Sequence, residues 1–368
     1  MSSDTMRAVD IKGGKGPATS LFINDKTPKP IPKPGEVLVR IKAFGLNRMD
    51  LMQREGRYPL PPQAPSTLGV EFSGTIESLG PPSPSPSPSP SPSDAEAFQP
   101  GDAVFGLAYG GAYAEYIAVS SRMILRKPAG LSWEAAAGVP EAWMTATQAL
   151  HLVAGFARGQ SVLWHAGASG VSLAGVQLSA RAGAAAVYAT AGTDDKCRFV
   201  EREVLSSSSS GSGDDNDDDA VIKVPVKAFN YRTRPDWDKA ILEATGGRGV
   251  DVIVDYIGAS YFERNLAVAA RDARWVSLAM LGGSRLEAGV DISGLLYKRV
   301  RIEGSTLRSR DIEYQGRLRD KLAEYLPDFE SGKLKVFVDT VFPMEDIVKA
   351  HQLMEENKTT GKIICTVS

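Results

Sequence analysis

The stretch from residue 161 to residue 187 constrains the fold of this chain more than any other. It reads SVLWHAGASGVSLAGVQLSARAGAAAV: a short apolar run at 162–164, a loop of small residues, and then apolar positions at helical spacing. Small residues in a turn between a strand and a helix let backbone N–H groups approach a phosphate, and the helix N-terminus adds partial positive charge. The segment therefore predicts a dinucleotide-binding turn.

The turn departs from the strict G-x-G-x-x-G pattern of such sites. Its local pattern is A-x-x-S-x-x-S, formed by Ala166, Ser169 and Ser172. Serine is small and its hydroxyl can itself bond a phosphate, so the interpretation survives the departure. An ordinary tight strand–helix turn is the alternative that this window alone leaves open.

Later segments place the turn in a larger sheet. Apolar strands are predicted at 185–190, 250–255 and 274–278, with helices between them. Alternating strands and helices predict a parallel sheet covered by helices on both faces. Because ligands bind at the carboxyl ends of such strands, the tips at 255–258 and 280–283 are expected to line the same crevice as the turn.

Bulk composition excludes several classes of function. The chain has 368 residues, which suggests two domains, and a formal charge of −2, which gives no case for binding nucleic acid or an anionic membrane. There is no apolar run of membrane-spanning length and no targeting segment, so a cytoplasmic location is expected. Two cysteines give neither a disulfide framework nor a cysteine-rich metal site. The three histidines lie in or beside apolar patterns and are expected to be packed.

The chain leaves a β-rich region and later returns to it. Short strands dominate from residue 6 to about 140, the βα pattern fills about 141–305, and the tail reads as strand, helix and strand. Two low-complexity insertions interrupt this order: a Ser–Pro tract at 81–93 and a Ser-rich acidic run at 206–220. Both are expected to be solvated loops.

With these parts in place, the chain resembles the zinc-independent quinone oxidoreductases of the medium-chain dehydrogenase/reductase superfamily, closest to the tumour-suppressor-inducible branch. The resemblance rests on several motifs in order: FGLNRMDLMQREGRYP, GVEFSGTI, VPEAWMTATQAL, VLWHAGASGV, FNYRT, VDVIVDYIG and GSTLRSR. It implies an α/β protein with a GroES-like β-rich catalytic domain, residues 1–140 completed by 309–368. A Rossmann NADP(H)-binding domain of doubly wound parallel sheet would occupy 141–308.

The resemblance also implies that no metal is bound. Zinc-dependent relatives carry a Cys ligand where this chain has Asn47, and a His–Glu pair where it has Val70 and Glu71. Zinc requires three or four N, S or O ligands in fixed geometry, and this chain offers no such set. We expect Glu71 to be a structural acid.

The expected cofactor is NADPH. The predicted strand at 185–190 is followed by Ala191, Gly192 and Thr193 rather than by a terminal acid, and Lys196 follows in the next helix. In the family, the equivalents of Thr193, Lys196 and Tyr231 surround the 2′-phosphate, whereas Asp194 and Asp195 argue the other way unless they cap the helix. The remaining cofactor-binding residues implied by the resemblance are Met144, Thr145, Ala168, Ser169, Gly170, Val171, Ile257, Gly258, Met280, Leu281, Thr306, Leu307 and Arg308. Arg308 could equally be a surface salt-bridge partner.

Asn47 and Tyr58 resemble the family residues on the substrate side of the nicotinamide. Asn47 could hydrogen-bond a substrate oxygen or cap the helix that follows it, and Tyr58 lies in a loop. The reaction expected is NADPH-dependent reduction of quinones or related conjugated carbonyls. Enoyl reduction, and a cofactor-binding protein without turnover, are the alternatives.

A homodimer is expected through the edge of the cofactor domain. The segment 295–307 is predicted to be the last strand of that sheet, and in the family this edge pairs with its two-fold mate. A monomer whose edge is protected by Lys298, Arg299 and Arg301 is the alternative.

Overall fold

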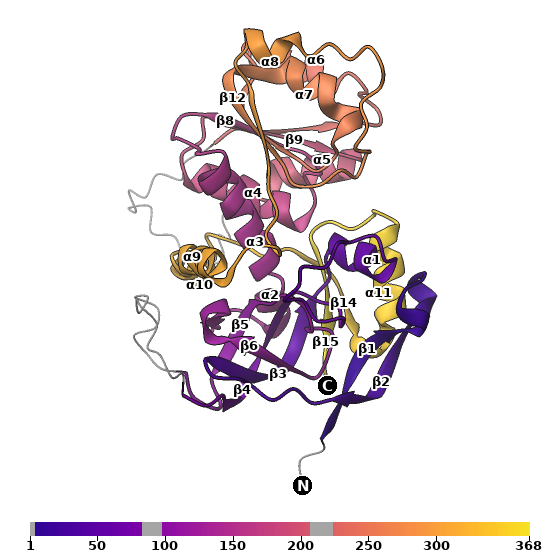
Figure 1. Cartoon of the computed structure of the whole chain (residues 1–368). Helices are drawn as coiled ribbons and strands as arrows, with labels where there is room; N and C mark the ends of the chain where they lie inside the picture. The colour runs from indigo at the N-terminus through magenta and orange to yellow at the C-terminus, as the bar shows by residue number, and fades with distance from the viewer. Residues whose placement is uncertain (1–3, 83–97, 207–223) are drawn as a thin grey trace. The chain divides into compact units, whose positions relative to one another are not determined.

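The computed structural model describes residues 4–82, 98–206 and 224–368, which form two compact units (Figure 1). Unit 1 comprises Met1–Met144 and Arg308–Ser368, and unit 2 comprises Thr145–Leu307. Most of both predicted insertions, residues 83–93 and 207–220, lies outside the described residues. Within the described ranges, no helix is both long and apolar enough to cross a membrane.

Unit 1 is built on a largely antiparallel sheet. The sheet has seven strands, of which β6 pairs with β3 beside the main path. The main path runs β14 (Val338–Pro343), β15 (Lys362–Thr366), β3 (Glu36–Gly45), β4 (Glu71–Leu79), β5 (Ala103–Leu107) and β7 (Ile124–Arg126), and β6 is Tyr116–Ser120. Only β14 and β15 pair in parallel. A separate hairpin joins β1 (Thr5–Ile11) and β2 (Leu21–Pro28).

The tail of the chain completes unit 1. Strand β15 lies between β14 and β3, with Ile364 opposite Gly45. The helices of this unit are α1 (Arg48–Arg54), α2 (Trp133–Ala137), α9 (Ile312–Ala323), α10 (Leu326–Glu330) and α11 (Ile347–Glu355); α3 (Pro140–Thr147) crosses the division between the units.

Unit 2 is a parallel sheet of six strands with helices on both faces (Figure 1). The order is β10 (Val226–Asn230), β9 (Ala186–Ala191), β8 (Ser161–Trp164), β11 (Val250–Asp255), β12 (Ala269–Ser277) and β13 (Arg301–Gly304). The helices are α4 (Gly170–Arg181), α5 (Asp194–Arg202), α6 (Trp237–Ala244), α7 (Phe262–Val268) and α8 (Ser293–Tyr297), with a π-helical turn at Gln148–Val153. The structure therefore confirms the predicted fold class.

The strand order of unit 2 reverses direction between β8 and β11. From β8 the chain moves outward through β9 to β10, and then returns to β11 on the other side of β8. Ligands of open parallel sheets bind at such a switch point, beyond the carboxyl ends of the strands. The loops after β8 and β11, at 165–169 and 256–258, leave the sheet at this point.

One predicted element is wrong. The segment 295–307 is not one strand, because Ser293–Tyr297 form α8 and only Arg301–Gly304 form β13. Leu295 to Tyr297 follow a helical path, and Arg299 adopts a left-handed φ of 54° before the strand begins. The short strand β13 does lie at the edge of the sheet, as predicted.

Candidate functional site

The turn after β8 is built from backbone geometry and small residues. Ala166 adopts a left-handed φ of 48°, a conformation that usually calls for glycine. A Cβ on Gly167 would lie 2.8 Å from the Cβ of Ala189, and one on Gly175 would lie 2.3 Å from the ring of Trp164. The loop and helix α4 therefore approach the sheet too closely for larger residues at these two positions.

The two serines of the turn have structural partners. The Ser169 Oγ caps α4 by accepting a hydrogen bond from the Ser172 backbone N–H at 3.3 Å. Ser172 is fully buried, and its hydroxyl donates to the carbonyl oxygen of His165 at 2.7 Å. Its hydroxyl is thus committed to the loop. Gly170 and Val171 follow the cap at the start of α4, where the first backbone N–H groups of a helix have no partner within the helix.

The loop after β11 is held by one buried carboxylate. Asp255 Oδ1 accepts hydrogen bonds from the backbone N–H of Ile257 at 2.7 Å and of Gly258 at 3.3 Å, and its Oδ2 accepts one from Trp275 Nε1 at 3.3 Å. Gly258 has a φ of +83°, and a Cβ there would lie 2.6 Å from the sulfur of Met280. The predicted residues Ile257, Gly258 and Met280 thus belong to one packed loop pair, with Met280 and Leu281 exposed at its rim.

At the end of β9, hydroxyl and cationic groups gather over Gly192. A Cβ on Gly192 would lie 2.8 Å from the Tyr231 hydroxyl and 3.6 Å from Arg232 Nε. Thr193 caps α5, accepting a hydrogen bond from the Lys196 N–H at 3.2 Å, and Lys196 lies in the first turn of that helix. Arg232 is a candidate that the sequence analysis missed, although it directly follows Tyr231 in the FNYRT motif.

Both acids beside this group have partners within unit 2. Asp194 accepts a hydrogen bond from Asn230 Nδ2 at 2.6 Å, and Asp195 forms an ion pair with Arg198. Asp194 is thus bound to a neighbouring strand, whereas Asp195 is 89% exposed at the side chain and is paired at the surface. A helix N-terminus with cations and hydroxyls suits a phosphate dianion better than it suits a bare ribose hydroxyl.

The candidate catalytic residue Asn47 belongs to a polar cluster, defined here as Asn47, Asp50, Glu71, Glu141 and Lys362. Lys362 Nζ lies 2.6 Å from Glu71 Oε1 and donates to the Leu46 carbonyl at 2.9 Å and to Asn47 Oδ1 at 2.8 Å. Glu71 is 0% and Lys362 6% exposed at the side chain. A buried ion pair of this kind requires all of these hydrogen bonds to offset its desolvation.

Glu71 is fully engaged within the polar cluster. Besides Lys362, its Oε1 accepts from Asn47 Nδ2 at 2.9 Å, and its Oε2 accepts from the Glu141 backbone N–H at 2.9 Å. Gly45 makes room for it, since a Cβ there would lie 2.3 Å from Glu71 Oε1. Glu71 is therefore a structural acid, as the sequence analysis expects.

Asn47 occupies the capping position that was one of the two roles left open by the sequence. It is the N-cap residue of α1, and its backbone N–H donates to Asp50 Oδ2 at 2.8 Å. Its side-chain amide joins Glu71 to Lys362, so one amide hydrogen is left for a further acceptor. The capping interpretation and the substrate-binding interpretation are thus compatible.

Two buried acids of the polar cluster titrate unusually. Burial raises the pKa of Asp50 to about 6, against hydrogen bonds from Asn47 and Tyr113 that lower it. Burial, and then the charge of Glu71, raise the pKa of Glu141 to about 8. Burial thus favours the protonated form of both acids, and more strongly in Glu141 than in Asp50. Glu141 belongs to the motif VPEAWMTATQAL, but nothing in the sequence pattern singles it out.

Arg308 and Tyr58 lie together in unit 1. The Arg308 guanidinium is 5.4 Å from the ring centroid of Tyr58, and its Nε and Nη1 donate to the Tyr109 carbonyl at 2.6 Å and to Gln53 Oε1 at 2.7 Å. Arg308 is only 2% exposed, so the interpretation as a surface salt-bridge partner is wrong. Burial, and then the charge of Glu141, raise the pKa of the Tyr58 phenol.

The other residues implied by the resemblance are distributed over both units. Met144 is buried at the end of unit 1, and Thr145 follows it in unit 2 on the same helix. Ala168 and Leu307 are buried, and the Thr306 carbonyl accepts a hydrogen bond from Gln148 Nε2 at 3.1 Å. Contact of these residues with a ligand remains a prediction.

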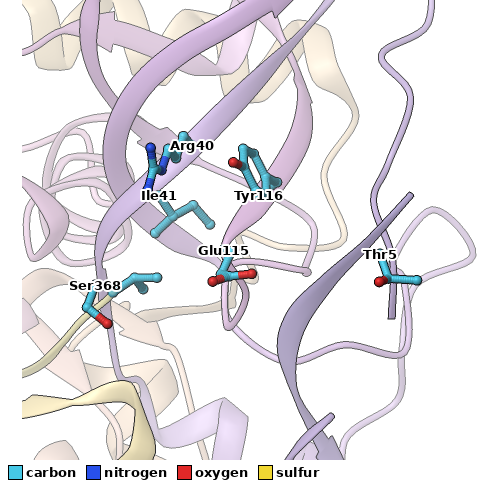
Figure 2. Close-up of a pocket in the computed structure, with 7 residues that line it drawn as sticks. Thr5, Arg40, Ile41, Glu115, Tyr116 and Ser368 are labelled. Carbon is cyan, nitrogen blue, oxygen red and sulfur yellow. The ribbon is translucent and has the colours of Figure 1, made fainter. Parts of the chain in front are cut away.

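A surface pocket in unit 1 lies apart from the predicted site residues (Figure 2). It is lined by Thr5, Arg40, Ile41, Glu115, Tyr116, Val367 and Ser368. Its acid is already engaged, because Glu115 accepts from the backbone N–H of Arg7 at 2.7 Å and from its Nε at 2.8 Å. None of the residues expected to bind cofactor or substrate contributes to this pocket.

Comparison with known proteins identifies the family. Residues 33–129 match the alcohol dehydrogenase GroES-like domain, and residues 224–365 match the zinc-binding dehydrogenase domain. The crystal structure of an NAD-dependent alcohol dehydrogenase is 30% identical and covers 99% of this chain and 100% of its own, with a TM-score of 0.77. The chain belongs to the medium-chain dehydrogenase/reductase superfamily. It is an oxidoreductase of that superfamily.

Two further relatives are similar over nearly the full length. Human quinone oxidoreductase is 28% identical over 361 residues, or 98% of this chain and 97% of the relative. A mycobacterial structure complexed with NADPH is 26% identical, with a TM-score of 0.78, and covers 98% of this chain and 99% of its own. Quinone oxidoreductases are thus among its relatives, at low identity.

The residues present do not fit the zinc that one of the matched domain names implies. Among the residues that the structure describes, no group of three or more His, Cys, Asp and Glu side chains could hold a metal ion. At the position in question, the cation facing Asn47 and Glu71 is the ammonium of Lys362.

Proposed function

We propose that this chain reduces quinones or related conjugated carbonyls with NADPH and without a metal. The observation that carries the proposal is the polar cluster, in which Lys362 supplies the positive charge facing Asn47 and Glu71. A substrate whose oxyanion is already delocalised, such as a quinone, has the least need of a Lewis acid. The similarity to human quinone oxidoreductase supports the same substrate class.

The cofactor proposal rests on the residues over Gly192. When bound, NADPH supplies the hydride, and the protein supplies placement and electrostatics. Thr193, Lys196, Tyr231 and Arg232 would hold the 2′-phosphate, and the start of α4 would hold the pyrophosphate. The alcohol dehydrogenase relative is described as NAD-dependent, whereas the mycobacterial relative holds NADPH. The proposed preference for NADPH therefore rests on the charged groups of this chain.

In unit 1 the chain's own side chains would handle the substrate. Asn47 would offer its remaining amide hydrogen to a substrate oxygen, held in place by Glu71 and Lys362. Tyr58 would present its hydroxyl and ring above Arg308. Both residues orient and polarise the substrate, which is the contribution expected when a cofactor carries the chemistry.

A steady-state assay tests the proposal. Wild-type enzyme is given NADPH or NADH with a panel of quinones, enones and enoyl thioesters, after treatment with a chelator. The proposal expects quinones or enones to be reduced fastest with NADPH, and no loss of activity on chelation. Preference for an enoyl thioester would favour enoyl reduction, and no turnover of any substrate would favour a binding protein.

We also propose that two copies of the chain pair through the edge of unit 2. All four residues of β13 are exposed, and so are the apolar side chains of Leu296 and Tyr297 on α8, at 74% and 71%. An open strand beside exposed apolar groups suits an isologous contact that extends the sheet. Light scattering at micromolar concentration should give the mass of two chains, and Ile302→Pro should shift it toward one. A one-chain mass for wild type would refute the dimer.

A further inference from the structure

A buried histidine of unit 2 has no part in the proposed reaction. His165 directly follows β8, at the start of the loop that leads to α4, and it is fully buried. Both nitrogens of its ring are engaged: Nδ1 lies 2.8 Å from Thr190 Oγ1, and Nε2 lies 2.7 Å from Asn265 Oδ1. Burial lowers the pKa of the ring, which favours its neutral form. Because an amide oxygen can only accept, Nε2 carries the proton and Nδ1 accepts from the Thr190 hydroxyl.

The contact with Thr190 ties His165 to the end of β9. Thr190 is 1% exposed and lies near the end of this strand, two residues before Gly192. The main chain strengthens the link, because the Gly167 N–H donates to the Thr190 carbonyl at 2.8 Å. The end of β9 is thus joined to the loop after β8 by both a backbone and a side-chain hydrogen bond.

The ring of His165 makes a second connection, through aromatic contacts. Its centroid lies 5.0 Å from that of Tyr261 at an interplanar angle of 75°, and 5.1 Å from that of Trp237 at 73°. The Tyr261 ring in turn meets the Tyr231 ring edge-on, with the centroids 6.5 Å apart. Edge-to-face pairs favour a defined relative orientation of the two rings. Two separate paths therefore run from His165 to the proposed 2′-phosphate group, one ending at Gly192 and the other at Tyr231.

The geometry at Gly192 leaves little freedom for movement. A Cβ on Gly192 would lie 2.8 Å from the Tyr231 hydroxyl, so the main chain passes close beneath this side chain. The next residue, Thr193, caps α5, whose first turn carries Lys196. A displacement of the end of β9 would therefore move the cap of α5 and the main chain beneath the Tyr231 hydroxyl together.

We propose that His165 is a positioning residue for recognition of the 2′-phosphate, because it fixes the end of β9 and the ring of Tyr231 relative to the loop after β8. This inference rests on the proposed function, since it concerns the proposed cofactor. The buried His165 side chain does not itself touch the phosphate. Loss of its contacts should therefore weaken recognition of the 2′-phosphate more than binding of the rest of the nucleotide.

Calorimetric titration with adenosine 2′,5′-bisphosphate and with 5′-AMP tests this role without turnover. Thr190→Val keeps the shape of the side chain and removes the hydroxyl that binds His165 Nδ1. It should lower the ratio of the two affinities, bisphosphate over monophosphate, by about three- to tenfold, the range that corresponds to one net hydrogen bond. The matched control is Thr245→Val, which removes a hydroxyl that donates to the Ile241 carbonyl at 2.9 Å at the end of α6. This control should leave the affinity ratio unchanged.

Two changes at His165 separate its contacts. An Asn oxygen can take the place of Nδ1, and a Gln amide nitrogen can take the place of Nε2. His165→Asn therefore keeps an acceptor for Thr190, whereas His165→Gln keeps only a donor for Asn265. Since both variants lose the ring, the affinity ratio should fall in both, and it should fall further in His165→Gln. Equal ratios in His165→Gln and wild type would contradict the positioning role.

The outcomes separate this inference from the proposed function. A wild type that prefers the bisphosphate, together with an unchanged ratio in Thr190→Val, refutes the positioning role alone. A wild type that binds both nucleotides equally refutes the proposed preference for NADPH, and the positioning role with it. Because Thr190→Val is nearly isosteric, it decides the question even where a change at His165 prevents folding.

Discussion

In unit 1 the candidate site contains buried charges that hold one another, whereas in unit 2 the turn after β8 takes its shape from the main chain. Removal of one member of the polar cluster leaves its partners buried and uncompensated. In the turn after β8, by contrast, Ala166 and the two serines stand in for glycines, and the turn keeps its form. The comparison teaches that the polar cluster depends on side-chain identity, and the turn after β8 on residue size and backbone conformation.

The largest expected effect comes from breaking the ion pair of unit 1. Lys362→Met removes the ammonium and leaves Glu71 buried without its counter-charge, so we expect a loss of about 3–5 kcal/mol in the free energy of unfolding. Urea denaturation measures it. Adding Glu71→Gln to Lys362→Met should recover part of the loss.

The control for this prediction is an exposed ion pair. Lys349 lies 2.8 Å from Asp346 and is 67% exposed at the side chain, so Lys349→Met should cost less than about 1 kcal/mol. If Lys362→Met were no more costly than Lys349→Met, the polar cluster would not be held together by its charges.

The next largest effect is expected on the affinity for NADPH, at Lys196 of unit 2. Lys196→Ala should weaken NADPH binding by about 1.5–3 kcal/mol, or about 10- to 150-fold, and leave NADH nearly unchanged, because a charge-assisted phosphate contact is lost. Titration of cofactor fluorescence measures both affinities. Lys239→Ala, an exposed lysine of α6, is the matched control. Equal weakening of both cofactors by Lys196→Ala would show that this lysine does not read the phosphate.

A third prediction follows from a buried histidine of unit 1. Burial, and then the charge of Arg54, lower the pKa of His351 to about 3 from the ordinary 6.5. The unfolded chain therefore binds a proton that the folded chain does not, and this contribution to stability, full above pH 6.5, is lost as the pH falls toward 3.

Unfolding free energies at two pH values measure this effect. Between pH 7 and pH 5 wild type should lose about 2 kcal/mol through His351, and His351→Gln should lack that part of the loss. Gln is chosen because it can still accept the hydrogen bond that Arg54 Nη1 makes to His351 Nδ1 at 3.1 Å. Identical pH dependence of the two proteins would contradict the prediction.

The smallest effect is expected on stability, at Ser172 in the turn after β8 of unit 2. Ser172→Ala removes the hydroxyl that donates to the His165 carbonyl, so we expect a loss of about 1 kcal/mol in the free energy of unfolding. NADPH affinity should stay within about twofold, because this hydroxyl points into the loop. A large loss of affinity with unchanged stability would mean that Ser172 binds the phosphate directly.

The sequence predicts the folds of both units because their patterns are local. The β8–turn–α4 segment, the parallel strands at 250–255 and the strand–helix–strand tail all follow from periodicity and turn residues. The strand expected at 295–307 fails because apolar residues such as Leu295 and Leu296 satisfy a short helix equally well.

The contacts within the polar cluster could not be predicted from the sequence. Lys362 opens an apolar strand and Glu71 opens another, 291 positions apart in the numbering, and only the pairing of β15 with β3 brings Lys362 to the end of β3. The signal available was a charged residue at the head of a buried strand in each case. Which partner neutralises which acid, and how strongly the protonated form of Glu141 is favoured, depends on burial that no local pattern encodes.

The position of β15 in the sheet affects when unit 1 can finish folding during synthesis. The acids Asp50, Glu71 and Glu141 all leave the ribosome before unit 2, and the lysine that neutralises Glu71 comes after it, on a strand that must enter between β14 and β3. A nascent chain that has completed unit 2 therefore still carries a first unit with an open sheet edge and unmatched negative charge. Unit 2, which is continuous in sequence, can fold first, and unit 1 can close only when the last strand arrives.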